Sequence, residues 1–131
     1  MSDVTLFYAK RIVGDADALA RFYCDVFGMN EVRRFEGPAG EEPHLEIFLS
    51  AGSNESDTQV ALMQWPNRPT PKPGEAAIAF MVKDVDAIVA AALARGGACT
   101  RAAETMKEYK FRWGVIADPE GHSIELMSYL A

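Results

Sequence analysis

An acidic side chain near the end of the chain is the first candidate for chemistry. Glu125 stands in the stretch DPEGHSIELMSYL, residues 118–130, where turn-forming residues precede an alternating, strand-like run. A carboxylate that faces an apolar cleft can act as a general base, accept a hydrogen bond from a ligand or pair with a ligand cation. The alternative is a structural role, in which a neighbour such as Lys10 holds Glu125.

A second group of possible donors lies in the stretch GEEPHLEIF, residues 40–48. His44 and Glu46 are two residues apart on an expected strand, so they share one face and could form a triad with Glu125. The simpler interpretation places His44 at an exposed strand start and Glu46 on the solvent side, unless Phe48, which has the same parity, faces a cavity. His122 follows the turn glycine and is expected to be a solvated hairpin residue.

An internal repeat organises these residues. Residues 13–28 (VGDADALARFYCDVFG) align without a gap to residues 82–97 (VKDVDAIVAAALARGG) at a constant offset of 69. In both copies an aspartate, Asp15 or Asp84, is placed to cap a helix, apolar residues follow at three- and four-residue spacing, and a glycine, Gly28 or Gly97, ends the segment. The repeat therefore predicts equivalent helices over residues 15–27 and 84–95.

Strand-like runs surround both expected helices. One run precedes each helix and three follow it, so the order β-α-β-β-β is written twice. The second run of the second copy, CTRAAETM, is weak, and residues 101–114 are instead expected to form a polar flap carrying Tyr109 and Trp113. Residues 66–75, PNRPTPKPGE, contain four prolines and suit a stiff connector. The prediction is an α+β fold of two curved, mostly antiparallel sheets, each with a helix on one face and a concave face free to line a cavity.

Composition limits the functional classes. The chain has 131 residues, 49% of them hydrophobic, and a formal net charge of −6. The charge argues against nucleic acid and mildly favours a cationic small molecule. Two cysteines, the short apolar runs and the absence of a signal-peptide pattern at the N-terminus predict a cytoplasmic protein that does not cross a membrane.

Three stretches in order, residues 13–29, 83–97 and 118–128, resemble the vicinal oxygen chelate superfamily, which includes glyoxalase I, extradiol dioxygenases and bleomycin-resistance proteins. The resemblance covers nearly the whole chain. It implies a single glyoxalase-like domain, with module one at residues 1–65, the connector at 66–75 and module two at 76–131. It also implies a homodimer.

The resemblance further implies four positions for metal ligands, on the first and last strand of each module. Glyoxalase I has His or Gln, Glu, His and Glu there, and the dioxygenases use two His and one Glu. In this chain the positions are expected at Tyr8, Leu62 (or Gln64), Ala77 and Glu125. Alanine and leucine offer no donor atom, and a phenol with a pKa near ~10 is a reluctant ligand. No metal or other cofactor is therefore expected.

Strand parity then predicts an apolar small-molecule cleft with Tyr8 and Glu125 as its reactive groups. Its expected lining consists of Phe48, Leu62, Gln64, Ala77, Met81, Tyr109, Trp113 and Met127. Two functions follow from these residues: metal-free binding of an apolar or cationic small molecule, or a lyase, isomerase or dioxygenase that uses Glu125 as base or metal ligand. A structural module with a filled cavity is least favoured, because cavity-facing alanines such as Ala77 and Ala79 leave space.

Overall fold

The computed structural model describes residues 3–37, 40–52 and 57–131, and it divides into two compact units. Unit one is Met1–Pro71 and unit two is Lys72–Ala131. The boundary falls inside the proline-rich stretch 66–75. Each unit is described by itself.

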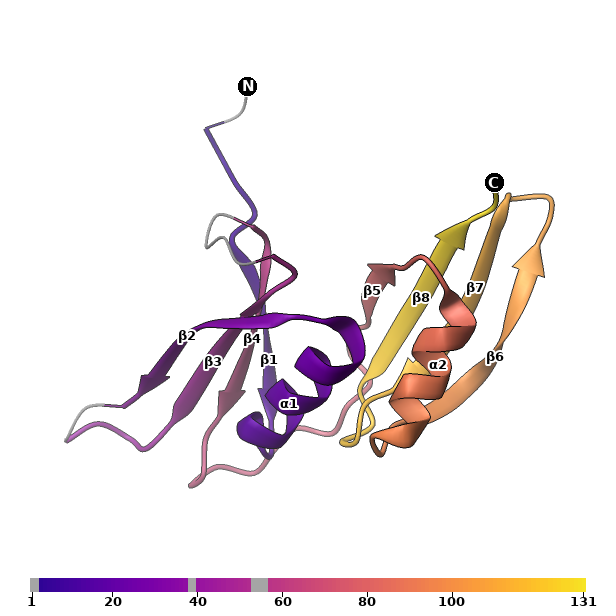
Figure 1. Ribbon diagram of the computed structural model, residues 1–131. Helices are drawn as coiled ribbons and strands as arrows, with labels where there is room; N and C mark the ends of the chain where they lie inside the picture. Colours follow the sequence, from indigo (N-terminus) through magenta and orange to yellow (C-terminus); the bar gives the residue numbers. More distant parts are fainter. Residues whose placement is uncertain (1–2, 38–39, 53–56) are drawn as a thin grey trace. The chain divides into compact units, whose positions relative to one another are not determined.

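Unit one is a four-stranded sheet with one helix. In chain order it contains β1 (Tyr8–Val13), α1 (Ala16–Phe27), β2 (Asn30–Glu36), β3 (Leu45–Ser50) and β4 (Gln59–Gln64). The strand order is β1-β4-β3-β2, with β1 parallel to β4 and the other pairs antiparallel (Figure 1). One face of the sheet packs on α1, which contacts β2, β3 and β4, and the opposite face is called the open face of unit one.

Unit two repeats this plan. It contains β5 (Ile78–Met81), α2 (Val85–Ala94), β6 (Ala98–Met106), β7 (Phe111–Ala117) and β8 (Ser123–Tyr129), in the sheet order β5-β8-β7-β6. Only β5 and β8 are parallel. The open face of unit two is the sheet face opposite α2. The expected α+β fold of two βαβββ modules is confirmed.

The two helices begin in the same way, as the repeat predicts. The side chain of Asp15 accepts a hydrogen bond from the Ala18 amide at 3.0 Å, and Asp84 accepts one from the Ala87 amide at 3.1 Å. Each carboxylate satisfies one of the amides that the first helical turn leaves unpaired. The predicted capping of both helices by the equivalent aspartates of the repeat is confirmed.

The helices end differently. Gly28 caps α1 in the left-handed region at φ 69°, where glycine has no steric penalty. In α2 the cap is Arg95, the left-handed residue is Gly96 at φ 88°, and the Gly97 amide reaches back to the Ala92 carbonyl at 2.9 Å. The expectation that Gly97 takes the place of Gly28 is wrong, because α2 stops earlier than α1.

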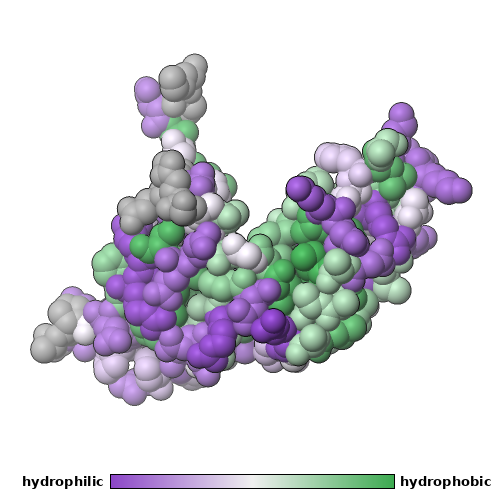
Figure 2. All heavy atoms as spheres, viewed as in Figure 1, coloured by the Kyte–Doolittle hydropathy of each residue, from purple (hydrophilic) through white to green (hydrophobic). Residues whose placement is uncertain are grey.

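The helices also differ in surface character. α1 buries an apolar stripe that includes Leu19, Phe22 and Tyr23, and it exposes polar residues elsewhere. α2 is rich in alanine, and only Val85 and Ala92 are buried in it. Its exposed surface is therefore weakly hydrophobic and is pale green in the space-filling view (Figure 2). Among the described residues, no helix is long and apolar enough to cross a membrane.

Candidate functional site

The open face of unit one is identified by strand register. Arg11 of β1 lies on the helix side, since its guanidinium donates to the Tyr23 hydroxyl of α1 at 3.2 Å. Tyr8 has the opposite parity, and its ring meets Phe48 edge to face at a centroid distance of 4.9 Å. Tyr8 and Phe48 therefore share the open face, as the sequence predicts.

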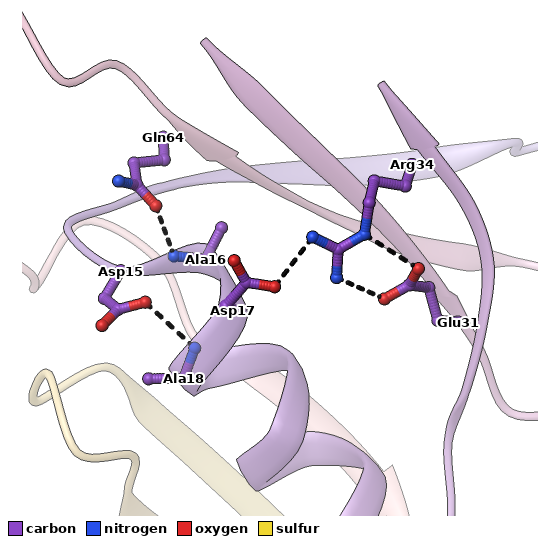
Figure 3. Close-up of polar contacts among 7 residues, drawn as sticks. All are labelled: Asp15, Ala16, Asp17, Ala18, Glu31, Arg34 and Gln64. Carbon is purple, nitrogen blue, oxygen red and sulfur yellow. Dashed lines mark hydrogen bonds and ion pairs between the residues drawn. The ribbon is translucent and has the colours of Figure 1, made fainter. Parts of the chain in front are cut away.

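The expected positions of Leu62 and Gln64 on this face are wrong. Leu62 pairs with Arg11 and Ile47 on the helix side and is 0% exposed. Gln64 points to the start of α1, where its Oε1 accepts a hydrogen bond from the Ala16 amide at 2.8 Å (Figure 3). The sequence register was off by one residue in β4, and a one-residue slip moves every side chain to the other face.

Ala61 is the β4 residue that sequence reasoning missed. It pairs with Lys10 of β1, and Glu125 of β8 pairs with Ala79 of β5, so Ala61 and Glu125 occupy matching places in the two sheets. The offset of 69 relates Lys10 to Ala79 but does not relate Ala61 to Glu125, so only the strand pairing locates this position. Ala61 offers no donor atom, just as Leu62 does not.

Glu46 lies on the open face of unit one and is only 9% exposed. Its Oε2 is 2.6 Å from the amine of Lys10. The expectation of a solvent-facing Glu46 is wrong, because Phe48, its parity mate, faces the open side and is itself buried. His44 is half-buried and directly precedes β3, and its ring lies 4.9 Å from that of Trp65.

The same face carries Arg33, which the sequence analysis did not single out. Arg33 pairs with Phe48 in the β2–β3 register, and its guanidinium carbon lies 5.0 Å from the centre of the Phe48 ring. The alternation of Arg33 with Phe35 along β2 was the available signal.

The open face of unit two carries the residues that parity predicts. Glu125 pairs with Ala79 and Val115, and Met127 pairs with Met81 and Trp113, so these six residues share one face. Ile124 and Leu126, of opposite parity, are fully buried on the α2 side. Glu125 is half-buried, whereas Met81 is 58% exposed.

Residues 101–114 form part of an antiparallel hairpin rather than a flap. β6 pairs with β7 along its length, and the turn occupies residues 107–110. Trp113 lies on the open face, with the guanidinium of Arg101 4.4 Å from its ring centre. Tyr109 stands on the turn and is 65% exposed, and Ala77 is an exposed residue just before β5.

Comparisons with known proteins agree with this architecture. Residues 5–126 match the family model of the Glyoxalase/Bleomycin resistance protein/Dioxygenase superfamily. The chain belongs to this superfamily.

Two curated relatives in the superfamily are named as lactoylglutathione lyases. The chain is 31% identical over 119 residues to a probable lactoylglutathione lyase of Synechocystis sp., covering 88% of each chain. It is 33% identical over 117 residues to the lactoylglutathione lyase of Haemophilus influenzae, covering 88% of this chain and 85% of the relative.

Solved structures show the same superfamily fold. The trypanothione-dependent glyoxalase I of Leishmania major matches with a TM-score of 0.79 and 27% identity, over 96% of this chain and 87% of that one. A glyoxalase I mutant from Zea mays gives a TM-score of 0.81 at 23% identity, over 96% of this chain. This chain spans 46% of the maize chain.

The metal that many members of the superfamily use does not fit the residues present. In unit one the matching places hold Tyr8 and Ala61, and in unit two they hold Ala77 and Glu125, so each unit offers one oxygen donor at most. Within residues 3–37, 40–52 and 57–131, no group of three His, Cys, Asp or Glu side chains could hold a metal ion. A divalent cation needs more donors than one phenol or one carboxylate supplies.

His122 has a structural place in the turn before β8. It is 6% exposed, and its amide donates to the Asp118 carboxylate at 3.0 Å, which also accepts from the Glu120 amide. The expectation of a solvated His122 is wrong, because the turn folds its ring inward.

Proposed function

We propose that this protein binds a small, largely apolar molecule without a metal in the superfamily's usual position. The observation that supports the proposal most directly is the pair of open faces. Each combines apolar or aromatic side chains with a few polar groups, which is the composition of small-molecule sites. Among the described residues, neither face carries the set of donor side chains that a divalent metal ion needs.

The proposed binding residues come from both units. Phe48 and Tyr8 belong to unit one, and Glu125, Met127 and Trp113 belong to unit two. Ala77, Met81 and Tyr109 complete the proposed set at exposed positions of unit two. Tyr8 would donate or accept a hydrogen bond, and Glu125 would pair with a cationic or hydrogen-bonding group of the ligand.

Binding and metal content are tested separately. A thermal-shift screen of small aromatics, cationic antibiotics and glutathione thioesters should raise the melting temperature for at least one class, because a ligand that binds only the folded state stabilises it. Elemental analysis of protein purified without chelator should find no stoichiometric nickel, zinc, iron or manganese. A stoichiometric metal that is lost in Glu125→Ala would overturn the metal-free proposal.

The second proposed function is that of the named relatives. An identity of 31–33% to two lactoylglutathione lyases supports a lyase in which Glu125 acts as base or as metal ligand. The assay is formation of the thioester product from methylglyoxal and glutathione, with and without added nickel or zinc. The Haemophilus influenzae relative serves as the positive control.

The variant that decides whether the protein is a lyase is Glu125→Gln. The matched control is Glu104→Gln, which changes a glutamate of β6 in the same sheet. Turnover that Glu125→Gln abolishes and Glu104→Gln keeps would favour the enzyme. Turnover equal to the buffer blank under all metal conditions would favour binding alone. A dioxygenase reaction is tested in parallel by oxygen consumption with a catechol.

We also propose that the chain forms a homodimer, as its superfamily resemblance implies. Light scattering coupled to gel filtration should give twice the chain mass of 14.3 kDa. A monomer across the accessible concentration range would contradict this.

A further inference from the structure

We propose that the open face of unit one binds an anionic group of a small-molecule ligand, a carboxylate or a phosphate, through the guanidinium of Arg33. The inference rests on the proposed small-molecule binding and names the chemistry of one end of the ligand. The net charge of −6 mildly favours cationic ligands for the chain as a whole. On this face, by contrast, the expected ligand group is an anion.

Aromatic rings hold Arg33 in place. Its guanidinium carbon lies 5.0 Å from the ring centre of Phe48, 5.3 Å from that of Phe7 and 5.8 Å from that of Phe35. Phe48 in turn packs edge to face on Tyr8 and Phe35. Such contacts attract the cation through the faces of the rings but accept none of its N–H groups in a strong hydrogen bond.

The guanidinium lacks an acceptor among the described residues. Its Nε is buried and makes no hydrogen bond, and Arg33 forms no ion pair with any carboxylate in residues 3–37, 40–52 and 57–131. Leaving a buried, charged donor unsatisfied costs free energy. An unpaired Arg33 guanidinium is therefore suited to a site in which a ligand supplies the hydrogen-bond acceptor.

The adjacent Arg34 shows the usual arrangement of an arginine in this unit. Arg34 is on the helix side, where its guanidinium bonds both oxygens of Glu31 at 2.8 and 3.0 Å and lies 2.8 Å from Asp17 (Figure 3). Two successive residues of β2 therefore carry the same group. Two carboxylates neutralise Arg34, and none of the described carboxylates pairs with Arg33.

The remaining charges on the open face do not neutralise Arg33. Glu46 of β3 is a buried carboxylate two residues from Phe48, the partner of Arg33 in the β2–β3 pairing. It already forms an ion pair with the amine of Lys10 at 2.6 Å. Lys10 and Glu46 cancel, so the guanidinium of Arg33 leaves the face with a local positive charge. This field attracts an anion at the place where aromatic rings would contact the rest of the ligand.

The rings near the guanidinium carbon accept none of its N–H groups in a strong hydrogen bond, so these groups are left for a ligand. Carboxylates and phosphates bind a guanidinium with two parallel hydrogen bonds, which is the strongest pairing that arginine makes. A flat apolar body attached to the anion would lie against Phe7, Phe35 or Phe48. The expected ligand is therefore an aromatic or acyl group that carries a carboxylate or phosphate.

The experiment compares four probes with the same ring system by isothermal titration calorimetry. They are 2-naphthoate, 2-naphthyl phosphate, the neutral 2-naphthamide and the cationic 2-naphthylmethylamine. The wild-type chain should bind at least one anion about tenfold more tightly than the amide, a difference of about 1.4 kcal/mol. The preference should shrink at high salt, since exposed charges are screened.

The variants are Arg33→Met, which keeps an unbranched apolar stem, and Arg34→Met, which removes the same charge on the other side of β2. Arg33→Met should bind the anions no better than the amide, and Arg34→Met should keep the wild-type preference. Circular dichroism checks that both variants fold. Whichever anion is preferred tells a carboxylate ligand from a phosphate ligand.

Three outcomes would overturn the inference. One is equal binding of anions and amide by the wild type, and another is an anion preference that survives Arg33→Met. If Arg33→Met does not fold, a wild-type preference that is unchanged at high salt counts against the inference in the same way. Binding of the amide without any anion preference leaves the proposed small-molecule function standing, whereas no binding by any of the four probes counts against both.

Discussion

The amine of Lys10 and the Oε2 of Glu46, 2.6 Å apart, join β1 to β3 across the open face of unit one. Oε2 accepts no well-aligned hydrogen bond there, so the attraction is that of an ion pair. Glu46 is buried and Lys10 is about one-third exposed, which places the pair between surface and core. Among the described residues, Arg33 has no carboxylate partner on this face.

Removing Glu46 should destabilise unit one. Glu46→Gln leaves the Lys10 amine without its partner, and we expect the free energy of unfolding to fall by roughly 1–2 kcal/mol, since solvent around Lys10 lessens the loss. Urea denaturation of Glu46→Gln, Lys10→Met and the double variant measures the coupling. Strictly additive effects of the two substitutions would contradict a stabilising pair.

The two helix caps should contribute independently. Asp15→Ala and Asp84→Ala each remove the acceptor of a first-turn amide, and each should lower the free energy of unfolding by about 1 kcal/mol. Asparagine accepts the same hydrogen bond, so Asp15→Asn and Asp84→Asn are the controls and should stay close to wild type. Losses of equal size in the Asn and Ala variants would show that charge, rather than capping, is responsible.

The ion pair between Asp86 and Arg112 should be visible in a pH titration. The hydrogen bonds from Arg112 lower the pKa of Asp86 from its usual 3.8, and the positive charge of Arg112 adds to this effect. A lowered folded-state pKa gives stability that is present above the unfolded pKa and is lost as the pH falls through the folded one. The loss should therefore occur in the acid range below the usual aspartate pKa.

Carbon-detected NMR of the Asp86 carboxyl measures this directly. In Arg112→Met the pKa of Asp86 should rise towards the usual value, whereas Arg101→Met, a change elsewhere in the same hairpin, should leave it in place. An Asp86 pKa that is the same in wild type and Arg112→Met would rule out the pairing in solution.

Leu62 should matter for stability and not for the ligand. Because it is fully buried on the α1 side, Leu62→Ala leaves a cavity and should cost about 2–5 kcal/mol in the free energy of unfolding. Met81→Ala, at an exposed position of the other open face, is the control and should cost little. If Leu62→Ala weakened naphthoate binding while it left stability unchanged, the β4 register described here would be wrong.

Gly114 should not tolerate a side chain. An added Cβ would lie 3.2 Å from the Cα of Ala103 in β6, at an irregular part of the β6–β7 register. Gly114→Ala should therefore cost roughly 1–3 kcal/mol by overpacking. The double variant Gly114→Ala/Ala103→Gly should not recover this loss, since the closest atom belongs to the backbone, and full recovery would point to the Ala103 side chain instead.

The fold could be read from the sequence because its signals are local. Asp15 and Asp84 mark helix starts by their own chemistry, and the offset of 69 relates them without any knowledge of packing. The parity of Glu125, Met127 and Trp113 was also correct, because β7 and β8 are regular where these residues lie. The end of α2 was missed by one residue, since two adjacent glycines, Gly96 and Gly97, offer the same signal.

The site was harder to predict because it depends on register and on long-range partners. An error of one residue in β4 moved Leu62 and Gln64 to the wrong face and concealed Ala61. Nothing in the sequence around Arg33 and Arg34 shows that only the second has carboxylate partners, because one of those partners, Asp17, comes from α1. The inward turn of His122 depends in the same way on backbone bonds to Asp118.

The parallel pairing of β1 with β4, and of β5 with β8, also sets the order in which each sheet can be completed. Tyr8 finds its partner Gln59 only after about fifty intervening residues, and Ile78 and Ile124 are almost as far apart in the chain. During synthesis the strand that carries Tyr8 must therefore wait for the end of unit one, while the β2–β3 hairpin with Arg33 and Phe48 can form earlier. The aromatic residues around Arg33 therefore come from a hairpin that can form early and from an edge strand that pairs late. If unit one folds slowly, the contact between Tyr8 and Phe48 should be among the last to form.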